Sequence, residues 1–365
     1  MPSDLLDPRD PRPAARSALR LWLDLQWTLG LAPQEAAEAL RRAGDPEAVL
    51  RHAGRPRTSR ARLAAGAACL ERIGAVGLAL LSRAYPPRLA ALPDAAPLLW
   101  VRGDPSALSA PAVAVVGSRA ASAYGLAVAR RLGRDLARAG LVVTSGLARG
   151  VDAAAHRGAL EAGGRTLAFL ACGLDRAYPA EHARLADEIA ASGAVATEHA
   201  PGTPPRRPYF PLRNRLLAGS ALALVVVEAR ERSGSLTTAA HAANQDLDVF
   251  AVPGRIDAPT SAGPNALLQQ GAYVARGAED VLSLLEQRGH WRPPAPARRP
   301  VRDAPEECEI VRALRHAPAS RDELARRLGR APGRLALELL ELELSGRVVE
   351  DRDGLLRPAG PPRSQ

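Results

Sequence analysis

AVAVVGSRAASAYGLAVARRLGRDLARAGLVVTSGLARGVDAAAH, residues 112–156, is the stretch around which this chain is organised. Two short apolar runs, residues 112–116 and 141–144, each end in small residues, and a helical pattern follows each of them. Buried parallel strands have such apolar runs, whereas a covering helix places apolar residues three or four positions apart. The second spacing is shown by Leu126, Ala129, Leu132, Leu136 and Ala139. The stretch therefore predicts two strand–turn–helix units whose turns lie at the carboxyl ends of strands, where open parallel sheets bind ligands.

Strand and helix patterns continue to alternate up to about residue 286. The expected strands are residues 98–101, 166–170, 194–197, 222–227 and 249–252, with an edge strand near 272–275. The expected helices among them are residues 180–191, 211–218, 236–245 and 266–270. Such alternation is typical of a doubly wound sheet with right-handed crossovers. We therefore expect an α/β fold with an extended Rossmann-like, mostly parallel sheet.

The flanking segments predict further domains. Helical spacing predicts an all-helical N-terminal domain over residues 1–83, of the SAM or helix-hairpin-helix kind, before a Rossmann-like domain over 84–288. Residues 289–304 are rich in Pro and Arg without periodicity, which indicates a linker. Residues 305–365 predict three helices and a hairpin with its turn at Asp353-Gly354, the pattern of a winged helix.

The winged-helix segment allows two interpretations. Winged-helix modules often bind duplex DNA, and a duplex-DNA regulator is one hypothesis for the whole chain. The third expected helix, however, contains ALELLELEL at residues 336–344, and its acidic face would repel phosphate. This pattern favours a contact with protein or a regulatory role.

Composition narrows the class of function. The chain has 365 residues, a formal net charge of +10 and a pI of about 10.6, which favour polyanionic partners, although a biased base composition would also enrich arginine. Lysine is absent, which excludes a Walker A loop and Schiff-base chemistry. The three cysteines form no CxxC pair, so neither a zinc site nor a disulfide framework is expected. Without a signal sequence or a long apolar run, a cytoplasmic protein without a membrane association is expected.

Four turns combine arginine with glycine, serine or asparagine, and each lies next to a predicted strand. Their candidate binding residues are Gly117, Ser118, Arg119, Ser145, Gly146, Arg149, Gly150, Arg213, Asn214, Arg215, Arg232, Ser233, Gly234 and Ser235. A dinucleotide site would need GxGxxG and an acidic end to the second strand, and both are missing. Four turns along one rim instead suit a linear chain of phosphates, with little base selectivity. No cofactor and no metal ion is expected.

Catalytic residues are sparse in this pattern. The histidines are scattered, and His156 is interpreted as a helix residue beside Asp152. Glu228 follows a strand and is open to two interpretations. It either orients Arg213 or Arg215 from below, which we favour, or serves as the catalytic carboxylate of a nucleotide phosphoribohydrolase-like enzyme. The SGSLTT loop at residues 233–238 lacks the paired glycines typical of such hydrolases, so no catalytic residue is assigned.

A set of motifs now points to one family. In order they are YPPRLAALPDAAPLLWVRGD, VAVVGSRAASAYG, TSGLARGVDAAAHRGAL, ACGLDRAYP, FPLRNRLLAGSA, VVVEARERSGSLTTAAHA, VFAVPG and GPNALLQQGA, within residues 84–285. This set closely resembles the DNA-processing protein A family, with compatible flanks. The resemblance implies a homodimer that binds single-stranded DNA, protects incoming strands during natural transformation and loads the RecA recombinase, without known catalysis.

The resemblance also assigns residues. Gly117, Ser118 and Arg119 match the DNA-contacting GSR turn. Ser145, Gly146 and Gly150 match the second glycine loop, and Arg213, Asn214 and Arg215 match the FPxRNR motif. After Tyr178-Pro179 the family commonly has a basic residue and an Asn, where this chain has Ala180 and His182, so Arg176 or Arg184 is a candidate replacement. Residues 267–273 are expected to form the dimer surface.

Overall fold

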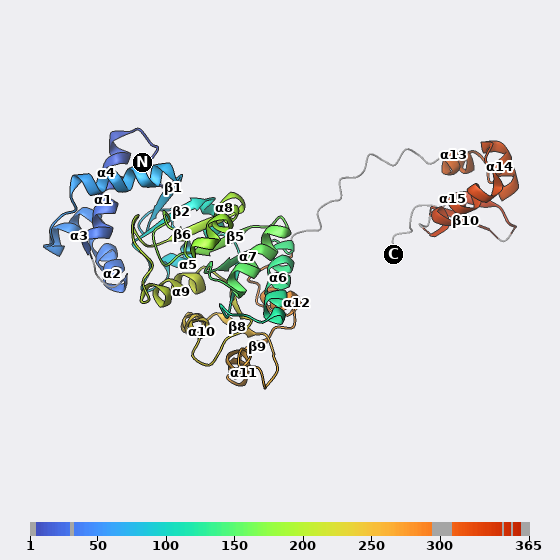
Figure 1. The fold of residues 1–365 in the computed structure, drawn as a ribbon. Coiled ribbons are helices and arrows are strands. Elements are labelled where there is room, and N and C mark those ends of the chain that lie inside the picture. The colour runs from blue at the N-terminus through green and yellow to red at the C-terminus, as the bar shows by residue number, and fades with distance from the viewer. Residues whose placement is uncertain (1–4, 30–32, 294–308, 345–346, 352, 359–365) are drawn as a thin grey trace. The chain divides into compact units, whose positions relative to one another are not determined.

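In a computed structural model, residues 5–29, 33–293, 309–344, 347–351 and 353–358 are described. They belong to two compact units, Met1–Pro294 and Ala295–Gln365 (Figure 1). The expected linker, residues 289–304, lies outside the described residues from position 294 onward. The expected domain boundary at residue 83 falls inside the first unit.

Among the described residues of the first unit, nine strands form one sheet in the order β1-β2-β6-β5-β4-β3-β7-β8-β9. The strands are β1 Ala75–Ala79, β2 Leu98–Gly103, β3 Ala112–Val116, β4 Val142–Ser145, β5 Thr166–Phe169, β6 Ala194–Thr197, β7 Ala223–Val226, β8 Asp248–Ala251 and β9 Tyr273–Val274. Neighbours from β6 to β9 run parallel, whereas β2 is antiparallel to both β1 and β6. The prediction of a mostly parallel sheet is confirmed.

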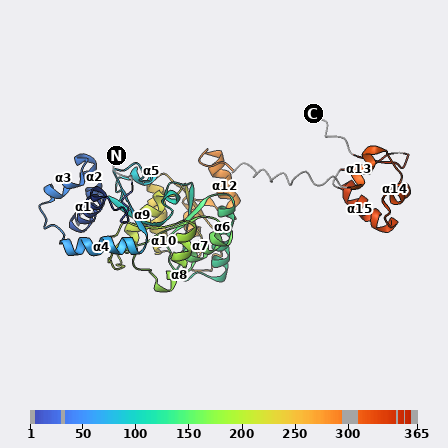
Figure 2. The same cartoon turned by 90° about the horizontal axis from the view of Figure 1, so that it is seen from above.

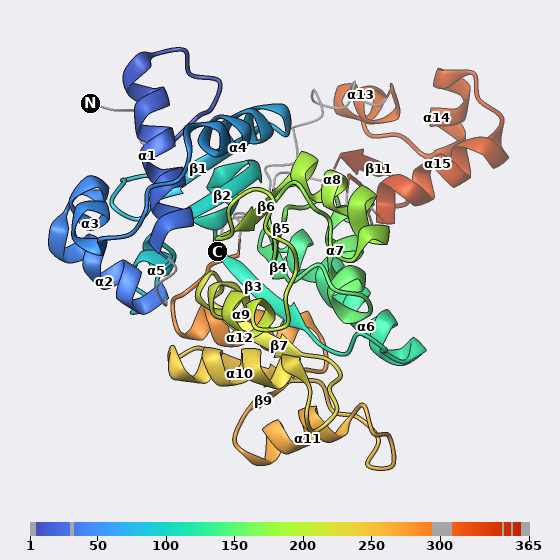
Figure 3. The ribbon, with the colours of Figure 1, turned by 60° about the vertical axis from the view of Figure 1, so that its left-hand side comes forward.

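Helices cover both faces of this sheet (Figure 3). Along β3, Val113 and Val115 face one core, and Ala114 and Val116 face the other. The first face is covered by α6 Ala123–Arg138, α7 Val151–Glu161, α8 Ala183–Ser192 and α12 Ala278–Gln287, and the second by α5 Pro87–Ala90, α9 Tyr209–Gly219 and α10 Gly234–Asn244. Short 3-10 turns occupy Pro105–Leu108 and Ala180–His182. The doubly wound arrangement is therefore confirmed.

The N-terminal segment extends the sheet as well as adding helices. Its helices are α1 Pro13–Leu29, α2 Pro33–Ala43, α3 Pro46–Ala53 and α4 Arg60–Arg72, which lie together at one end of this unit (Figure 2), the end that carries β1 (Figure 1). The expectation that this segment is all-helical to residue 83 was wrong at its end, because fully buried AVGLA forms β1. Gly74, with a φ of +64°, provides the turn between α4 and this strand. Trp100 of β2 joins the helical core, and its indole N–H donates to the Gln26 side chain at 2.9 Å.

The second unit has the predicted winged-helix elements. They are α13 Glu309–His316, α14 Arg321–Leu328, α15 Pro332–Leu344, β10 Val348–Glu350 and β11 Leu356–Pro358. The Ser320 hydroxyl accepts a hydrogen bond from the Glu323 amide at 3.3 Å and so caps α14. On α15, Leu335 and Leu339 are buried, whereas Leu337 and Leu340 are exposed.

Across the described residues, no helix is both long and apolar enough to cross a membrane.

Candidate nucleic-acid interface

Strand β3 is the point at which the order of the sheet reverses. From β3 the chain adds β4, β5 and β6 on one side and later β7, β8 and β9 on the other. In doubly wound sheets, ligands bind in the crevice outside the carboxyl ends of the strands at such a reversal. The turns after β3 and β7 meet there, since the Ser118 amide donates to the Glu228 carbonyl at 2.6 Å.

Hydrogen bonds and close packing join the predicted turns. The Ser235 hydroxyl donates to the Gly117 carbonyl at 2.8 Å, which connects the first turn of α10 to the turn after β3. The Val151 amide donates to the Ser118 carbonyl at 3.2 Å, which connects that turn to the one after β4. Gly150 has a φ of +76°, and a Cβ there would collide with the Ser118 carbonyl oxygen. The turns therefore lie side by side at the carboxyl edge of the sheet, hereafter the rim.

Arg213 supports the rim from inside the protein. It is 5% exposed, and its guanidinium donates to the Gly146 carbonyl at 2.8 Å and to the Phe169 carbonyl. Burial lowers the pKa of Arg213 to about 10, so the group stays charged at neutral pH. The neighbouring Asn214 amide donates to the Gly234 carbonyl at 3.3 Å. Both side chains hold the turns in place, which corrects the expectation that they contact phosphate directly.

Arg215 is also committed to the interior. It is 1% exposed and makes a two-point ion pair with Glu198, with N–O distances of 2.8 and 2.7 Å. Its Nε lies 3.1 Å from the Asp94 carboxylate. Burial alone would lower the pKa of Arg215, but the two carboxylates raise it overall. Because the guanidinium has no exposed face, we withdraw Arg215 from the expected DNA contacts.

Ser145 is another predicted residue that the structure buries. As the last residue of β4 it is fully buried, and its hydroxyl donates to the Val115 carbonyl at 2.6 Å. This hydroxyl fixes neighbouring strands and does not face the crevice, contrary to the prediction. The buried Gly117 and Gly146 contribute backbone to the rim, and Gly146 lines its pocket.

The exposed side chains of the rim surround a cavity of about 250 Å³, hereafter the rim pocket. Arg119 and Arg149 line it from the turns after β3 and β4, Tyr178 lines it from the loop that precedes α8, and Phe210 lines it from the first turn of α9. The Arg119 guanidinium lies over the Phe210 ring, 5.0 Å from its centre, and the Tyr178 and Phe210 rings are 5.5 Å apart. The pocket therefore offers two cations for phosphate next to two aromatic faces for a base.

The loop before α10 extends the rim on the far side of the first turn. Arg232 and Gly234 are exposed, and the half-buried Ser233 hydroxyl caps α10 by accepting from the Ser235 amide at 3.3 Å. This loop ends at a helix N-terminus, where backbone N–H groups favour an anion. Arg176 and Arg184, the suggested replacements for the missing basic residue, pair with Asp175 and Glu188 and do not line the rim pocket.

Two useful residues of the rim pocket were not assigned from the sequence alone. Phe210 and Tyr178 were not among the assigned binding residues, although aromatic residues make up only 3% of the chain and both stand next to assigned motifs. Glu181 was also missed, and it forms an ion pair with Arg149 inside the pocket. The hydrogen bond from Arg149 lowers the pKa of Glu181, so this carboxylate is charged at neutral pH.

Replacing Glu181 with glutamine is expected to tighten the binding of a polyanion about two- to fivefold. Glu181 competes with phosphate for Arg149, and exposed ion pairs of this kind contribute about 0–1 kcal/mol. Titration of wild type and Glu181→Gln with a labelled single strand at low salt measures the change. The matched control is Glu188→Gln, which removes an exposed partner of Arg184 outside the pocket. Weaker binding by Glu181→Gln would show that the carboxylate takes part in recognition.

Glu228 has a structural role that neither interpretation of the sequence anticipated. It is 3% exposed, and its two carboxylate oxygens accept from the Ser122 amide at 2.8 Å and the Ser122 hydroxyl at 2.6 Å. Ser122 caps α6, so Glu228 fixes this helix to β7, and the expectation that it orients Arg213 or Arg215 was wrong. The same commitment leaves neither oxygen directed at a substrate, so the geometry does not favour a hydrolase.

His156 is buried in α7, as the helix interpretation expected. The Thr166 hydroxyl donates to the Val143 carbonyl at 2.6 Å, so the His156 Nδ1–H donates to that hydroxyl oxygen, also at 2.6 Å. Burial, together with electrostatic repulsion from His182 and Arg213, lowers the pKa of His156 to about 3. The imidazole is therefore neutral in the folded protein at any mild pH.

This buried histidine is expected to make the fold acid-sensitive. The unfolded chain binds a proton at His156 near pH 6.5 and the folded chain does not, so stability is complete above pH 6.5 and falls as the pH drops toward 3. The slope from this one group is at most about 1.4 kcal/mol per pH unit. Urea unfolding between these pH values should show a shallower dependence in His156→Asn than in wild type. Identical slopes in the two proteins would contradict this assignment.

Comparison with known proteins agrees with this arrangement. The family described as DNA recombination-mediator protein A matches residues 78–286. The chain belongs to this family. The family's winged-helix domain, described as the DprA winged helix domain, matches residues 293–354. The resemblance to the DNA-processing protein A family is therefore confirmed.

Individual relatives cover most of the chain. Protein Smf of Escherichia coli is 39% identical over 282 residues, which are 76% of this chain and 75% of the relative. The solved structure of DNA processing protein A from Streptococcus pneumoniae has a TM-score of 0.59 and 35% identity, and it covers 69% of this chain and 86% of its own. The DNA processing protein A structure from Helicobacter pylori, described for its single-stranded DNA binding mode, has a TM-score of 0.52 and 30% identity. It covers 56% of this chain and 93% of its own.

Proposed function

We propose that this protein is a non-catalytic mediator of recombination that binds single-stranded DNA at the rim. In this proposal it acts in the cytoplasm, protects incoming strands during natural transformation and loads the RecA recombinase onto them. The observation that carries the proposal is the rim pocket, where Arg119 lies over Phe210 beside Tyr178. Membership of the recombination-mediator family supports it.

The chemistry of the rim pocket favours a single strand over a duplex. The faces of unpaired bases are accessible, so Phe210 and Tyr178 have flat partners, whereas a duplex keeps its base faces stacked inside. Arg119 and Arg149 supply cations at the same place, and Arg232 and the α10 N-terminus continue the positive surface along the rim. The phosphates of one strand would therefore follow the turns at Ser118, Arg119, Arg149, Gly150, Arg232, Ser233, Gly234 and Ser235.

The proposal is tested by comparing a labelled single strand of about 20 nucleotides with its duplex at about 50 and 200 mM salt. We expect at least tenfold tighter binding of the single strand and a clear loss of affinity at the higher salt. Equal affinity for both forms would overturn the proposal. The same titration with a chain ending at residue 294 examines the winged-helix hypothesis. Retention of all DNA binding there, duplex binding included, would argue against a duplex-DNA regulator that acts through the second unit.

We also propose that the protein acts as a homodimer through the β9 edge. Strand β9 is the last in the sheet, and its residues Tyr273 and Val274 are both exposed. Beside it lies a groove of about 540 Å³ between α10 and α11 Ala262–Gln269, lined by Leu236, Leu247 and Leu267. An open strand edge next to an apolar groove suits pairing with an identical surface.

A charge placed on this surface is expected to separate the dimer. Leu268→Arg introduces an uncompensated cation beside the groove, which should convert the dimer to a monomer in sedimentation or light scattering at micromolar concentration. Leu81→Arg is the matched control, because Leu81 is an exposed leucine that follows β1 at the opposite edge of the sheet. A Leu268→Arg protein that stays dimeric would refute this surface.

A further inference from the structure

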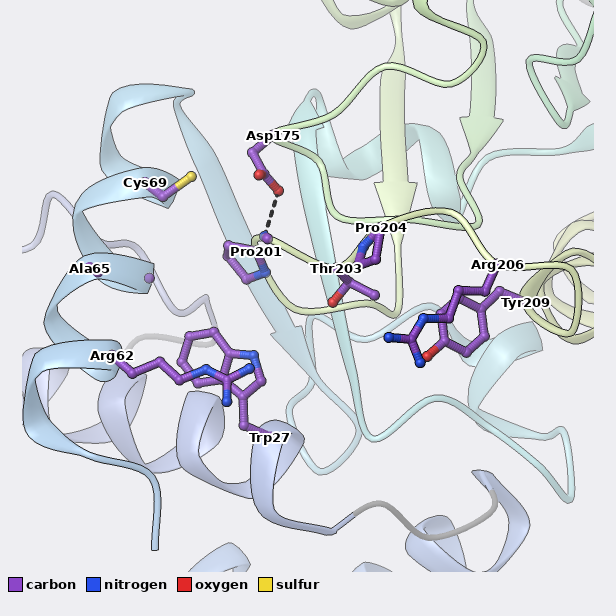
Figure 4. Close-up of a pocket in the computed structure, with 12 residues that line it drawn as sticks. Trp27, Arg62, Ala65, Cys69, Asp175, Pro201, Thr203, Pro204, Arg206 and Tyr209 are labelled. Carbon is purple, nitrogen blue, oxygen red and sulfur yellow. Dashed lines mark hydrogen bonds between the residues drawn. The ribbon is translucent and has the colours of Figure 1, made fainter.

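A second pocket lies where the N-terminal helices meet the loops of the sheet (Figure 4). Its volume is about 470 Å³, and it lies between α1, α4 and the loops that follow β5 and β6. The aromatic and cationic side chains that α1 and α4 contribute to this pocket belong to none of the motifs that identify the family. We name it the Trp27 pocket.

One wall of the Trp27 pocket pairs an aromatic ring with a cation. The Arg62 guanidinium of α4 lies over the indole of Trp27, 4.7 Å from the ring centre. Gly66, one turn later in α4, allows the indole to lie against this helix, because a Cβ there would collide with the ring. Trp27 is half-buried, so the ring is held by packing while part of it faces the pocket.

The opposite wall has the same combination. Arg206 lines it from the segment that leads into α9 and Tyr209 lines it as the first residue of that helix, with its ring 4.4 Å from the His199 ring. In the part of the chain that the structure describes, no carboxylate pairs with the Arg62 or Arg206 guanidinium. Asp175 at the edge of the pocket is occupied, since it accepts from the Gly202 amide at 2.8 Å and lies 3.7 Å from the Arg176 guanidinium.

These walls match the two parts of a nucleotide. An unpaired base is flat and stacks on aromatic rings, and its phosphate pairs with a guanidinium. An acidic peptide would satisfy the two cations but would make no use of the parts of the Trp27 and Tyr209 rings that face the pocket. The residues therefore favour a nucleotide over a peptide.

The Trp27 pocket and the rim pocket are lined by different residues, but these are neighbours along the chain at two places. Tyr209 lines the first and Phe210 lines the second, and their Cα atoms are about 3.8 Å apart, as in any two consecutive residues. Asp175 and Tyr178 are likewise divided between the two pockets, only three residues apart. A strand long enough to follow this segment beyond the rim pocket would reach the Trp27 pocket.

We propose that the Trp27 pocket is a second nucleotide subsite, which holds a base and phosphate of the same single strand that occupies the rim. This rests on the proposed single-strand binding, and it makes the N-terminal helices part of the DNA-binding surface. The subsite increases the number of nucleotides that contact the protein, so its effect on affinity depends on the length of the oligonucleotide.

The test is a series of oligothymidylates from about 4 to 16 nucleotides, the range of site sizes known for single-strand binders. Wild type should gain affinity with length up to a plateau. Arg62→Ala and Arg206→Ala should bind the shortest oligomers as wild type does but bind the longest about tenfold less tightly. Arg51→Ala, an exposed arginine of α3 outside the pocket, should behave as wild type at every length.

A spectroscopic readout accompanies the titration. Long oligomers should quench the fluorescence of Trp27, short ones should not, and the quenching should vanish in Trp27→Phe. Arginine variants that follow wild type at all lengths, or that lose affinity equally at all lengths, would overturn the subsite while leaving the proposed function intact. Absence of single-strand binding by wild type at every length would instead overturn the proposed function.

Discussion

The Arg119→Ala protein should bind single-stranded DNA about 10- to 100-fold less tightly than wild type. Arg119 is exposed, lines the rim pocket and lies over Phe210, so its guanidinium is free to pair with a phosphate. A hydrogen bond to a charged group contributes about 1.5–3 kcal/mol, which gives a change of this size. The contact is not part of the folded core, so stability should stay unchanged.

Fluorescence anisotropy with one labelled strand measures this change at two salt concentrations. The salt dependence of binding should also become less steep in the variant, because one phosphate contact is lost. Arg138→Ala is the matched control. Arg138 is an exposed arginine in the last turn of α6, the helix whose first turn lies at the rim, so it sits at the far end of that helix. Equal affinities of Arg119→Ala and wild type would remove this residue from the interface.

The Arg215→Met protein should lose about 3–5 kcal/mol of folding stability, because the substitution leaves the buried Glu198 carboxylate without its partner. Urea unfolding followed by tryptophan fluorescence suits this measurement, since all four tryptophans lie in the first unit. The variant Arg102→Met serves as a control. The ion pair between Arg102 and Asp187 is partly exposed, so it should contribute less than about 1 kcal/mol to stability.

The double variant Arg215→Met with Glu198→Leu separates the two explanations for such a loss. Replacing both members of a buried ion pair by apolar residues is often neutral, so the second substitution should restore at least half of the stability. A single variant as stable as wild type would show that the ion pair is dispensable. A double variant less stable than the single one would show that Glu198 has partners of its own.

Most of the sheet could be predicted from the sequence because its strands are short apolar runs that end in small residues. Residues 194–197 were predicted to the residue, and the turn after 112–116 was placed correctly at the carboxyl edge. Strand β1 was missed because AVGLA continues directly from a helical segment. An apolar run of this length looks the same in a helix and in a strand. Only its pairing with β2 in the folded protein shows that it is a strand.

The orientation of the arginines could not be predicted in the same way. Arg215 stands in a motif rich in charge, and its partner Glu198 ends a different strand that only the fold brings near. Every residue from 213 to 219 in α9 is buried, so this helix has no polar face to reveal which arginine points outward. The arginines in the turns next to predicted strands therefore indicated the position of the rim. They did not show that Arg119 is exposed, whereas Arg213 is buried and supports the rim from inside the protein.

The hydrogen bonds that join the turns of the rim have a kinetic consequence. The hydrogen bonds from Ser235 to the Gly117 carbonyl and from Arg213 to the Gly146 carbonyl hold the binding surface in its final shape before any strand arrives. Association then needs no slow rearrangement, and electrostatic steering sets its rate. The observed rate constant should rise linearly with DNA concentration without reaching a ceiling. Under the proposed function, such a preformed surface would compete with nucleases through its frequency of encounter with a strand, and salt would act mainly on the association rate constant.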